Sequence, residues 1–193
     1  GGDETFGGYP WRYELVKNCK SPQEFEALTY KYRSRLIKDH DKKHFFSPQT
    51  LEQIGNHTSL QTLQQVLINS SENDFIKKAL YFDAKTFLHG ILVVEDKLSM
   101  AHSLESRVPF LDNELVDFSS SIPTKYLINN SWYGGATKDI NISGKYIFRR
   151  AMEGVLPREI IENRKQGFSA PDQSWYMKHL VQYIKGIILS SRS

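Results

Sequence analysis

Apolar residues recur at helical spacing along much of the chain, whereas the strict alternation typical of half-buried strands is nearly absent. The clearest case follows Ser21-Pro22-Gln23-Glu24, which combines the serine, proline and glutamate of a capped helix start. The apolar positions after it repeat at helical spacing: Phe25, Leu28, Tyr32 and Leu36. The overall pattern therefore predicts a mainly α chain.

Caps and helix breakers predict the remaining elements in the same way. A helix that starts at Ser47-Pro48 should stop at Gly55, and Ser59 should cap the next one. The most apolar stretch, Asp74 to about Ser103, predicts one or two central and largely buried helices. Three further helices are predicted: Asp112 to Pro123, Lys145 to Glu153, and a last one from Gln173 that carries Trp175, Leu180, Ile184 and Ile188. A proline-started turn is expected at Pro157, and an exposed loop at Asn129 to Ser143.

Composition and charge narrow the function classes. The chain has 193 residues, 39% of them hydrophobic, which suffices for a sizeable core in one domain or a large part of one. A net charge of +3 is too small and too scattered for a nucleic-acid footprint, although anionic small molecules remain open as ligands. The single cysteine, Cys19, excludes an internal disulfide and fits a reducing, cytoplasmic setting. With no hydrophobic signal region and no membrane-length apolar run, we expect no membrane association.

The first segment with candidate chemistry is G-G-D-E-T-F-G-G-Y-P-W at the start of the chain. Gly1 and Gly2 allow backbone amides to approach a ligand closely, and Asp3 and Glu4 are hard-oxygen ligands of the kind that hold Mg²⁺ beside phosphates. These four residues are candidates for a nucleotide triphosphate site. The alternative is a glycine-rich turn with two solvated acids, and this segment alone leaves both interpretations open.

Two further segments combine glycine, proline and charge in ways that core packing does not require. In the stretch from Ser99 to Asp112, Glu105 and Arg107 precede a Val108-Pro109 junction, where the helix must end and place the ionic pair near its C-terminus. Arg107 then either satisfies the helix dipole and a carboxylate or contacts a substrate. His102 in the same stretch is expected to be an ordinary, partly buried histidine.

The third segment, Arg164 to Pro171, reads R-K-Q-G-F-S-A-P. Lys165 there offers a compact point charge that can follow a migrating phosphate charge. The alternative is a solvated charge on a surface loop. The order in which all three segments occur along one chain favours a shared site.

Five ordered blocks resemble the synthetase domain of the glutamine-hydrolysing asparagine synthetase family, whose relatives make β-lactam rings or close lasso peptides. The blocks span nearly the whole chain: Gly1 to Tyr9, Met100 to Asp112 (M-A-H-S-L-E-S-R-V-P-F-L-D), Lys145 to Ala151 (K-Y-I-F-R-R-A), Leu156 to Ile161 (L-P-R-E-I-I) and Arg164 to Phe168 (R-K-Q-G-F). The resemblance implies the C-terminal helical portion of an α/β ATP-pyrophosphatase domain, a type of adenine nucleotide alpha-hydrolase-like fold.

The family's chemistry supplies the expected roles. It activates the side-chain carboxylate of aspartate with ATP and Mg²⁺ as an acyl-adenylate, which ammonia from an N-terminal glutaminase domain converts to asparagine, AMP and pyrophosphate. The resemblance implies that Asp3 binds Mg²⁺-pyrophosphate with Glu4 beside it, and that Lys165 is catalytic because it stabilises charge on the phosphates. Lys145 is implied in cofactor binding, and Glu105 and Arg107 in the substrate-site wall.

The departures from the family pattern define further expectations. The serine-glycine-glycine phosphate loop, the strand before it and the terminal cysteine of the glutaminase do not occur in the 193 residues. Residues 1–193 are therefore expected to be a partial synthetase domain, inactive alone, that exposes apolar surface and is either marginally stable or self-associating as a homo-oligomer. Two other functions remain open: an amidotransferase that tailors a sugar-linked or peptide carboxylate, and a noncatalytic helical interaction module.

Overall fold

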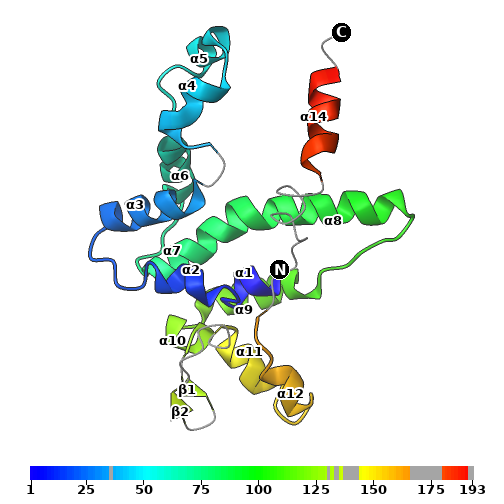
Figure 1. The fold of residues 1–193 in the computed structure, drawn as a ribbon. Helices are drawn as coiled ribbons and strands as arrows, with labels where there is room; N and C mark the ends of the chain where they lie inside the picture. Colours follow the sequence, from blue (N-terminus) through cyan, green and yellow to red (C-terminus); the bar gives the residue numbers. More distant parts are fainter. Residues whose placement is uncertain (35–36, 130, 133–134, 137–143, 166–179, 191–193) are drawn as a thin grey trace.

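The protein is predominantly helical in its computed structural model, which confirms the mainly α prediction (Figure 1). The structure describes residues 1–34, 37–129, 131–132, 135–136, 144–165 and 180–190. The α-helices are α1 (Gly2–Thr5), α2 (Pro10–Glu14), α3 (Pro22–Arg33), α4 (Lys42–Phe45), α5 (Pro48–Ile54), α6 (Ser59–Leu67), α7 (Phe75–Phe82), α8 (His89–Ala101), α9 (Asn113–Ser121), α10 (Thr124–Leu127), α11 (Tyr146–Ala151), α12 (Arg158–Ile161) and α14 (Val181–Ser190).

Shorter elements connect these helices. They are the 3₁₀ turns η1 (Asp39–Asp41) and η3 (Pro109–Leu111), the π-helical segment η2 (Asp83–Leu88), and the strands β1 (Ser131–Trp132) and β2 (Gly135–Ala136). The two strands pair antiparallel, with Ser131 opposite Ala136 and Trp132 opposite Gly135. This hairpin lies inside the segment predicted as an exposed loop.

Several helix ends follow the predicted capping chemistry. The Ser21 side chain accepts a hydrogen bond from the Glu24 backbone N–H, and Gly55 ends α5 at a positive φ of 58°. Asp112 caps α9 as predicted, but Thr58 rather than Ser59 caps α6. Thr58 gains a reciprocal bond from the Gln61 side chain, and this capping box decides between the two neighbouring hydroxyl residues.

The α7, η2 and α8 segments follow one another in the chain and form the long rod seen in Figure 1. The core packs against its first part and against α2 and α3, with Phe25 stacked on Phe75 at a ring-centroid distance of 5.4 Å. The buried apolar residues of this core are Phe6, Tyr13, Val16, Phe25, Ala79, Leu80, Ile122 and Leu127. Burial of these side chains from water stabilises the arrangement.

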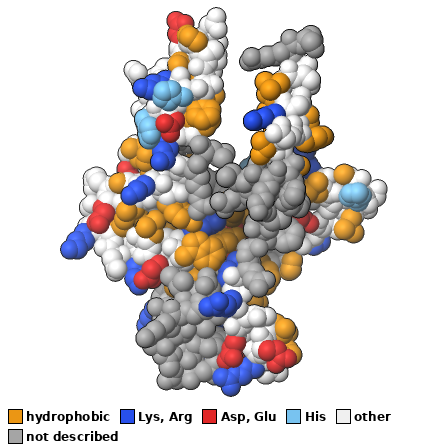
Figure 2. All heavy atoms as spheres, viewed as in Figure 1, with side chains coloured by type: hydrophobic (Ala, Val, Ile, Leu, Met, Phe, Trp, Pro, Cys, Tyr) orange, Lys and Arg blue, Asp and Glu red, His pale blue; other side chains and the backbone are white. Residues whose placement is uncertain are grey.

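The second part of the rod is not buried, so the prediction of largely buried central helices is wrong for α8. Val94 and Leu98 are 56% and 62% exposed, and the last helix, α14, exposes Tyr183 and Leu189 in the same way. Figure 2 shows hydrophobic side chains at the surface along α14. The expected exposed apolar surface is therefore present. No helix in the described part of the chain is both long and apolar enough to cross a membrane.

Other predicted boundaries move by a few residues. The helix before Val108-Pro109 ends already at Ala101, and Pro109 begins η3 instead. Lys145 lies just before α11 rather than inside it, with a left-handed φ of 56°. The predicted start of the last helix at Gln173, together with Trp175, lies outside the described residues, which resume at Leu180.

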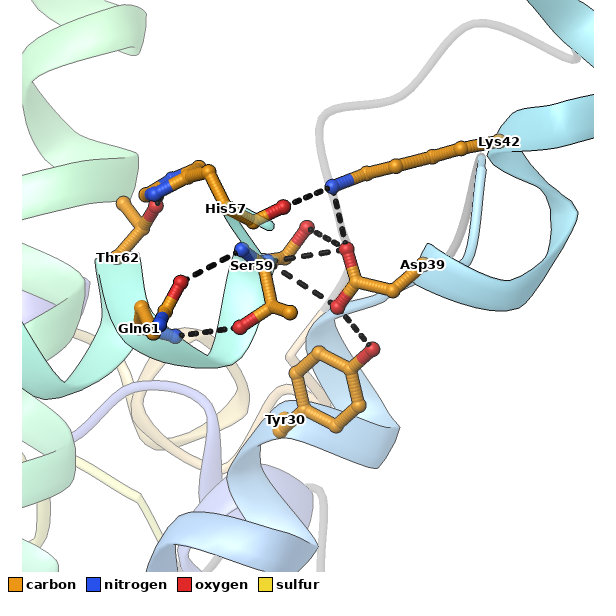
Figure 3. A network of polar contacts seen from close by, with 8 residues as sticks. Tyr30, Asp39, Lys42, His57, Ser59, Gln61 and Thr62 are labelled. Carbon is orange, nitrogen blue, oxygen red and sulfur yellow. Dashed lines mark hydrogen bonds and ion pairs between the residues drawn. The ribbon is translucent and has the colours of Figure 1, made fainter. Parts of the chain in front are cut away.

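Asp39 fixes the segment between α3 and α6, as Figure 3 shows. Its carboxylate accepts hydrogen bonds from the Tyr30 hydroxyl at 2.6 Å and from the backbone N–H and hydroxyl of Ser59 at 3.0 to 3.1 Å. Lys42 pairs with the same carboxylate at 2.7 Å and donates to the His57 carbonyl at 2.9 Å. One side chain thus joins α3, η1 and the start of α6.

Candidate active site

The candidate site is centred on the Asp3 carboxylate, which lies between two lysines that are distant in sequence. Lys145 Nζ lies 2.7 Å from Oδ1 and Lys165 Nζ lies 2.9 Å from Oδ2. The Asp3 and Lys165 side chains are 18% and 17% exposed, so the cluster is largely shielded from water. Three of the predicted site residues therefore meet at one point.

A glycine turn brings the backbone close against Asp3. Gly7 has a φ of 71°, which favours glycine, and the Gly8 N–H donates to the Asp3 carbonyl at 2.7 Å. A Cβ on Gly8 would lie 1.9 Å from Asp3 Oδ1, far inside the van der Waals limit. Glycine at this position therefore leaves the space that the carboxylate occupies.

The same turn receives the segment that carries Lys145. The Lys145 N–H donates to the Phe6 carbonyl at 3.1 Å, and a Cβ on Gly144 would lie 2.5 Å from the Gly7 oxygen. Two backbone segments about 140 residues apart in sequence thus touch directly, at a distance that only glycine allows. This contact delivers the Lys145 side chain to Asp3.

Arg149 on α11 ties together the two segments that carry the lysines. Its Nε donates to the Gly144 carbonyl at 3.0 Å, and its Nη1 donates to the carbonyls of Asn163, at 3.0 Å, and Ile161. Burial lowers the pKa of Arg149, an effect that the nearby charge of Asp3 opposes. The sequence reasoning missed this residue, and its place in the block K-Y-I-F-R-R-A was the available signal.

Electrostatics keep the Asp3 carboxyl ionised. Burial raises the pKa of Asp3, but hydrogen bonds and charge from Lys145 and Lys165 outweigh this effect and hold the pKa below its usual value. The site therefore presents an ionised Asp3 carboxylate between two lysine side chains. Such a cluster can exchange one of its internal ion pairs for an external cation or anion.

Glu4, the acid adjacent to Asp3, does not point into this cluster. Its side chain is buried, and its Oε1 accepts a hydrogen bond from the Tyr9 hydroxyl at 2.8 Å. Burial, followed by the hydrogen bond to Glu4, raises the pKa of Tyr9 well above its usual value, so the hydroxyl remains a donor. Glu4 is thus an internal acceptor in this structure.

Gly1 and Gly2 lie where the first and second motifs meet. A Cβ on Gly1 would lie 3.0 Å from Leu111 Cγ, and one on Gly2 would lie 3.1 Å from Phe110 Cγ. These tight contacts join α1 to η3, which belongs to the block from Met100 to Asp112. The two glycines therefore serve close packing here.

Glu105 and Arg107 lie on the segment between α8 and η3 and pair with each other at 2.6 Å. Both side chains are more than 70% exposed. None of the hydrogen bonds or ion pairs seen among the described residues joins either of them to Asp3, Lys145 or Lys165. The structure therefore brings three predicted site residues together and leaves these two apart.

A Mg²⁺ ion fits this site only if substrate phosphates share its coordination. Asp3 supplies one hard carboxylate, and nowhere in the described part of the chain are three or more His, Cys, Asp or Glu side chains grouped to hold a metal ion. Magnesium is commonly held by one or two carboxylates, phosphate oxygens and water rather than by an all-protein cage. The donor chemistry of Asp3 is consistent with that mode of binding.

The fold and the cluster thus define a helical protein whose acid and lysines come from separate motifs. The asparagine synthase family model matches residues 1–193, and the chain belongs to this family. It is 36% identical over 125 residues to asparagine synthetase 1 of Bacillus subtilis, an alignment that covers 64% of this chain and 18% of that protein.

Two other similar proteins extend this comparison. Asparagine synthetase 3 of Bacillus subtilis is 27% identical over 188 residues, covering 96% of this chain and 28% of that protein. A putative asparagine synthetase of Mycobacterium tuberculosis H37Rv is 28% identical over 202 residues, an alignment that covers 91% of this chain and 29% of that protein. The chain therefore spans less than a third of the length of these relatives. No solved structure matches the chain significantly.

Proposed function

We propose that the protein carrying this chain forms an amide in an ATP-dependent reaction, with aspartate as the substrate and asparagine as the product. The observation that carries the proposal is the Asp3 carboxylate held between Lys145 and Lys165. Family membership over all 193 residues supports the same class of reaction. Ammonia would come from a glutaminase domain, as the relatives' names, glutamine-hydrolysing asparagine synthetases, suggest.

The proposed reaction has two steps. A side-chain carboxylate oxygen of aspartate attacks the α-phosphorus of ATP, a phosphorus–oxygen bond forms, and the bond to the β-phosphate bridging oxygen breaks to release pyrophosphate. The ammonia nitrogen then attacks the acyl carbon, the carbon–oxygen bond to AMP breaks, and the nitrogen loses a proton. Both steps move negative charge among phosphate oxygens, so fixed positive charge should supply much of the acceleration.

The chain's own residues suit these steps. Lys165 and Lys145 are compact cations that can pair with phosphate oxygens when those oxygens replace the Asp3 carboxylate. Asp3, freed from one or both lysines, would hold Mg²⁺, which neutralises phosphate charge when bound. The pairing of Asp3 with both lysines keeps the Asp3 carboxyl ionised and holds the three groups close together before the substrate arrives.

The test is exchange of labelled pyrophosphate into ATP by the complete protein. We expect exchange that requires both Mg²⁺ and aspartate, with AMP rather than ADP as the nucleotide product once ammonia is added. Glutamate in place of aspartate is the matched control for the acceptor. Exchange without any carboxylate, or formation of ADP and inorganic phosphate, would contradict the acyl-adenylate proposal.

A further inference from the structure

Tyr9 lies between the Asp3 cluster and a buried ion group on the long rod. Its ring centroid is 5.4 Å from Lys165 Nζ and 3.9 Å from Arg12 Cζ, so two cations lie over one ring. Its hydroxyl donates to the buried Glu4 at 2.8 Å. One side chain therefore contacts both the site lysine and the helix that carries Asp3.

The Arg12 side chain is itself held in place by contacts with residues of η2. Its Nη1 lies 3.1 Å from Oδ2 of Asp83, whose side chain is fully buried in η2 and whose Oδ1 pairs with Arg33. The Arg12 guanidinium also lies 4.5 Å from the ring centroid of Phe87, and Phe87 meets the Tyr9 ring edge-on at 5.9 Å. The Tyr9 ring is thus held against the rod by charge and by aromatic contacts.

An aromatic ring and a carboxylate attract an ammonium in different ways. The Asp3 carboxylate carries a full negative charge that neutralises Lys165, whereas the ring attracts through its quadrupole and leaves the full positive charge in place. A lysine held by the ring remains able to act on a phosphate after its ion pair with Asp3 has been exchanged. The Tyr9 ring can therefore hold Lys165 in place without neutralising its charge, which the Asp3 carboxylate cannot do.

We propose that Tyr9 is a positioning residue, whose ring orients the Lys165 ammonium toward the substrate phosphates and whose hydroxyl fixes α1 through Glu4. The part of this proposal in which Lys165 acts on phosphates rests on the proposed function. The placement of Lys165 by the ring is a separate, structural part, and it can be measured without turnover.

Two variants of Tyr9 separate the contribution of the ring from that of the hydroxyl. Tyr9→Phe keeps the ring and removes the donor to Glu4, whereas Tyr9→Leu removes both. The matched control is Tyr126→Leu, which removes a surface ring whose centroid lies 4.9 Å from Lys125 Nζ. Tyr126 belongs to α10 and is 42% exposed, so its loss should leave the site unaffected.

The structural readout is the NMR signal of Lys165 in the complete protein after ¹³C dimethylation of its lysines, assigned by its disappearance in Lys165→Arg. A group over a ring is shifted upfield, so we expect Tyr9→Leu to move this signal toward the position of exposed lysines. Tyr9→Phe and Tyr126→Leu should leave it in place. An unmoved signal in Tyr9→Leu, or an equal displacement in Tyr9→Phe, would overturn the proposal.

The functional readout is pyrophosphate exchange. Loss of a partly shielded cation–π contact should lower the exchange rate of Tyr9→Leu by roughly 3- to 30-fold, with Tyr9→Phe between it and the wild type. The fall should appear in kcat more than in the KM for aspartate, because the contact acts on the phosphates. If Tyr9→Leu does not fold, Phe analogues at position 9 with increasing ring fluorination replace it, because they keep the shape and weaken the quadrupole.

The exchange rate should then fall stepwise with fluorination, and a flat series would overturn the proposal. Failure of the proposed function has a different signature. A wild-type protein without any exchange would refute acyl-adenylate formation, while the Lys165 signal would still decide whether the Tyr9 ring places that lysine.

Discussion

Two aspartates of this protein, Asp3 and Asp39, are both bound to lysine, yet their surroundings differ in kind. Asp39 pairs with Lys42, three residues away, and accepts hydrogen bonds from Tyr30 and from the first residue of α6 (Figure 3). Asp3 pairs with Lys145 and Lys165, which come from other parts of the chain.

The difference supports the proposal that Asp3 acts in the active site and that Asp39 has a structural role. A carboxylate that accepts from a backbone N–H, a tyrosine and a serine at a helix start is satisfied by groups that cannot leave without loss of the fold. The ammonium groups at Asp3 sit on long side chains and can leave without unfolding a helix. A metal ion and phosphates can therefore replace them, and close backbone packing around Asp3 keeps the site in shape.

The largest effect should come from Lys165. In the complete protein, Lys165→Ala should lower pyrophosphate exchange by on the order of 10² to 10³, comparable to loss of one preorganised donor. Lys165→Arg should restore only part of it, because the planar guanidinium cannot occupy the place of a point charge. Lys42→Ala is the control and should leave exchange intact. Wild-type exchange in Lys165→Ala, with folding verified by circular dichroism, would make Lys165 a surface charge.

A smaller loss should follow from one added methyl group beside Asp3. The Cβ of Gly8→Ala would lie 1.9 Å from Oδ1, so the carboxylate or the turn must shift. A displacement of this size should lower exchange by on the order of 10-fold to 10²-fold. In Gly154→Ala the new Cβ meets no atom within 4 Å, so only backbone strain at its φ of 80° is expected. Equal losses in both variants would show that the close approach to the Asp3 carboxylate is not the source of the effect.

Asp39→Asn should instead affect stability and leave exchange intact. The lost ion pair and acceptor should lower the free energy of unfolding by about 1–3 kcal/mol at neutral pH. Burial raises the pKa of Asp39, but hydrogen bonds from Lys42, Tyr30 and Ser59 outweigh this effect and hold the pKa below its usual value.

This stabilisation is therefore complete above the unfolded-state pKa of about 3.9 and is lost as the pH falls through the lower folded-state pKa. Denaturant titrations of wild type and Asp39→Asn should show a difference at neutral pH that shrinks in acid below that value. A difference that stays constant or grows in acid would show that the carboxylate charge is not the source of the stabilisation.

The smallest effect should be the coupling between Glu105 and Arg107. Because both side chains are highly exposed, a double-mutant cycle should give less than about 1 kcal/mol, and added salt should reduce it further. The turnover of the same variants tests the predicted role in the substrate-site wall. A large fall in exchange without loss of stability would place them in the site after all.

Local chemistry made much of the fold predictable from the sequence. Ser21, Gly55 and Asp112 each act through neighbours within a few residues, so capping and breaking signals sufficed. At Thr58-Ser59 two adjacent hydroxyl residues compete, and only the reciprocal bond to Gln61 decides between them. The exposure of α8 was not predictable from its apolar composition, because composition does not reveal what packs against a helix.

The residues of the candidate site could be predicted from the sequence motifs, but the residues that hold the neighbouring Tyr9 and Glu4 in place could not. Asp3, Lys145 and Lys165 stand out by residue type and by the family blocks. Arg12 and Asp83 are 71 residues apart and belong to no block, so only the folded chain reveals that they meet behind Tyr9. Likewise, nothing in the local sequence shows that Glu4 would turn toward Tyr9 rather than stand beside Asp3.

Whether Asp3 belongs to the active site can be tested by comparing the two aspartates in one assay. Asp3→Asn and Asp39→Asn remove one charge each from an aspartate–lysine cluster, and pyrophosphate exchange in the presence of aspartate and Mg²⁺ is measured for both in the complete protein. We expect Asp3→Asn to lose on the order of 10²-fold or more in exchange while remaining folded. Asp39→Asn should retain wild-type exchange at reduced stability. Wild-type exchange in folded Asp3→Asn would contradict the assignment of Asp3 to the active site.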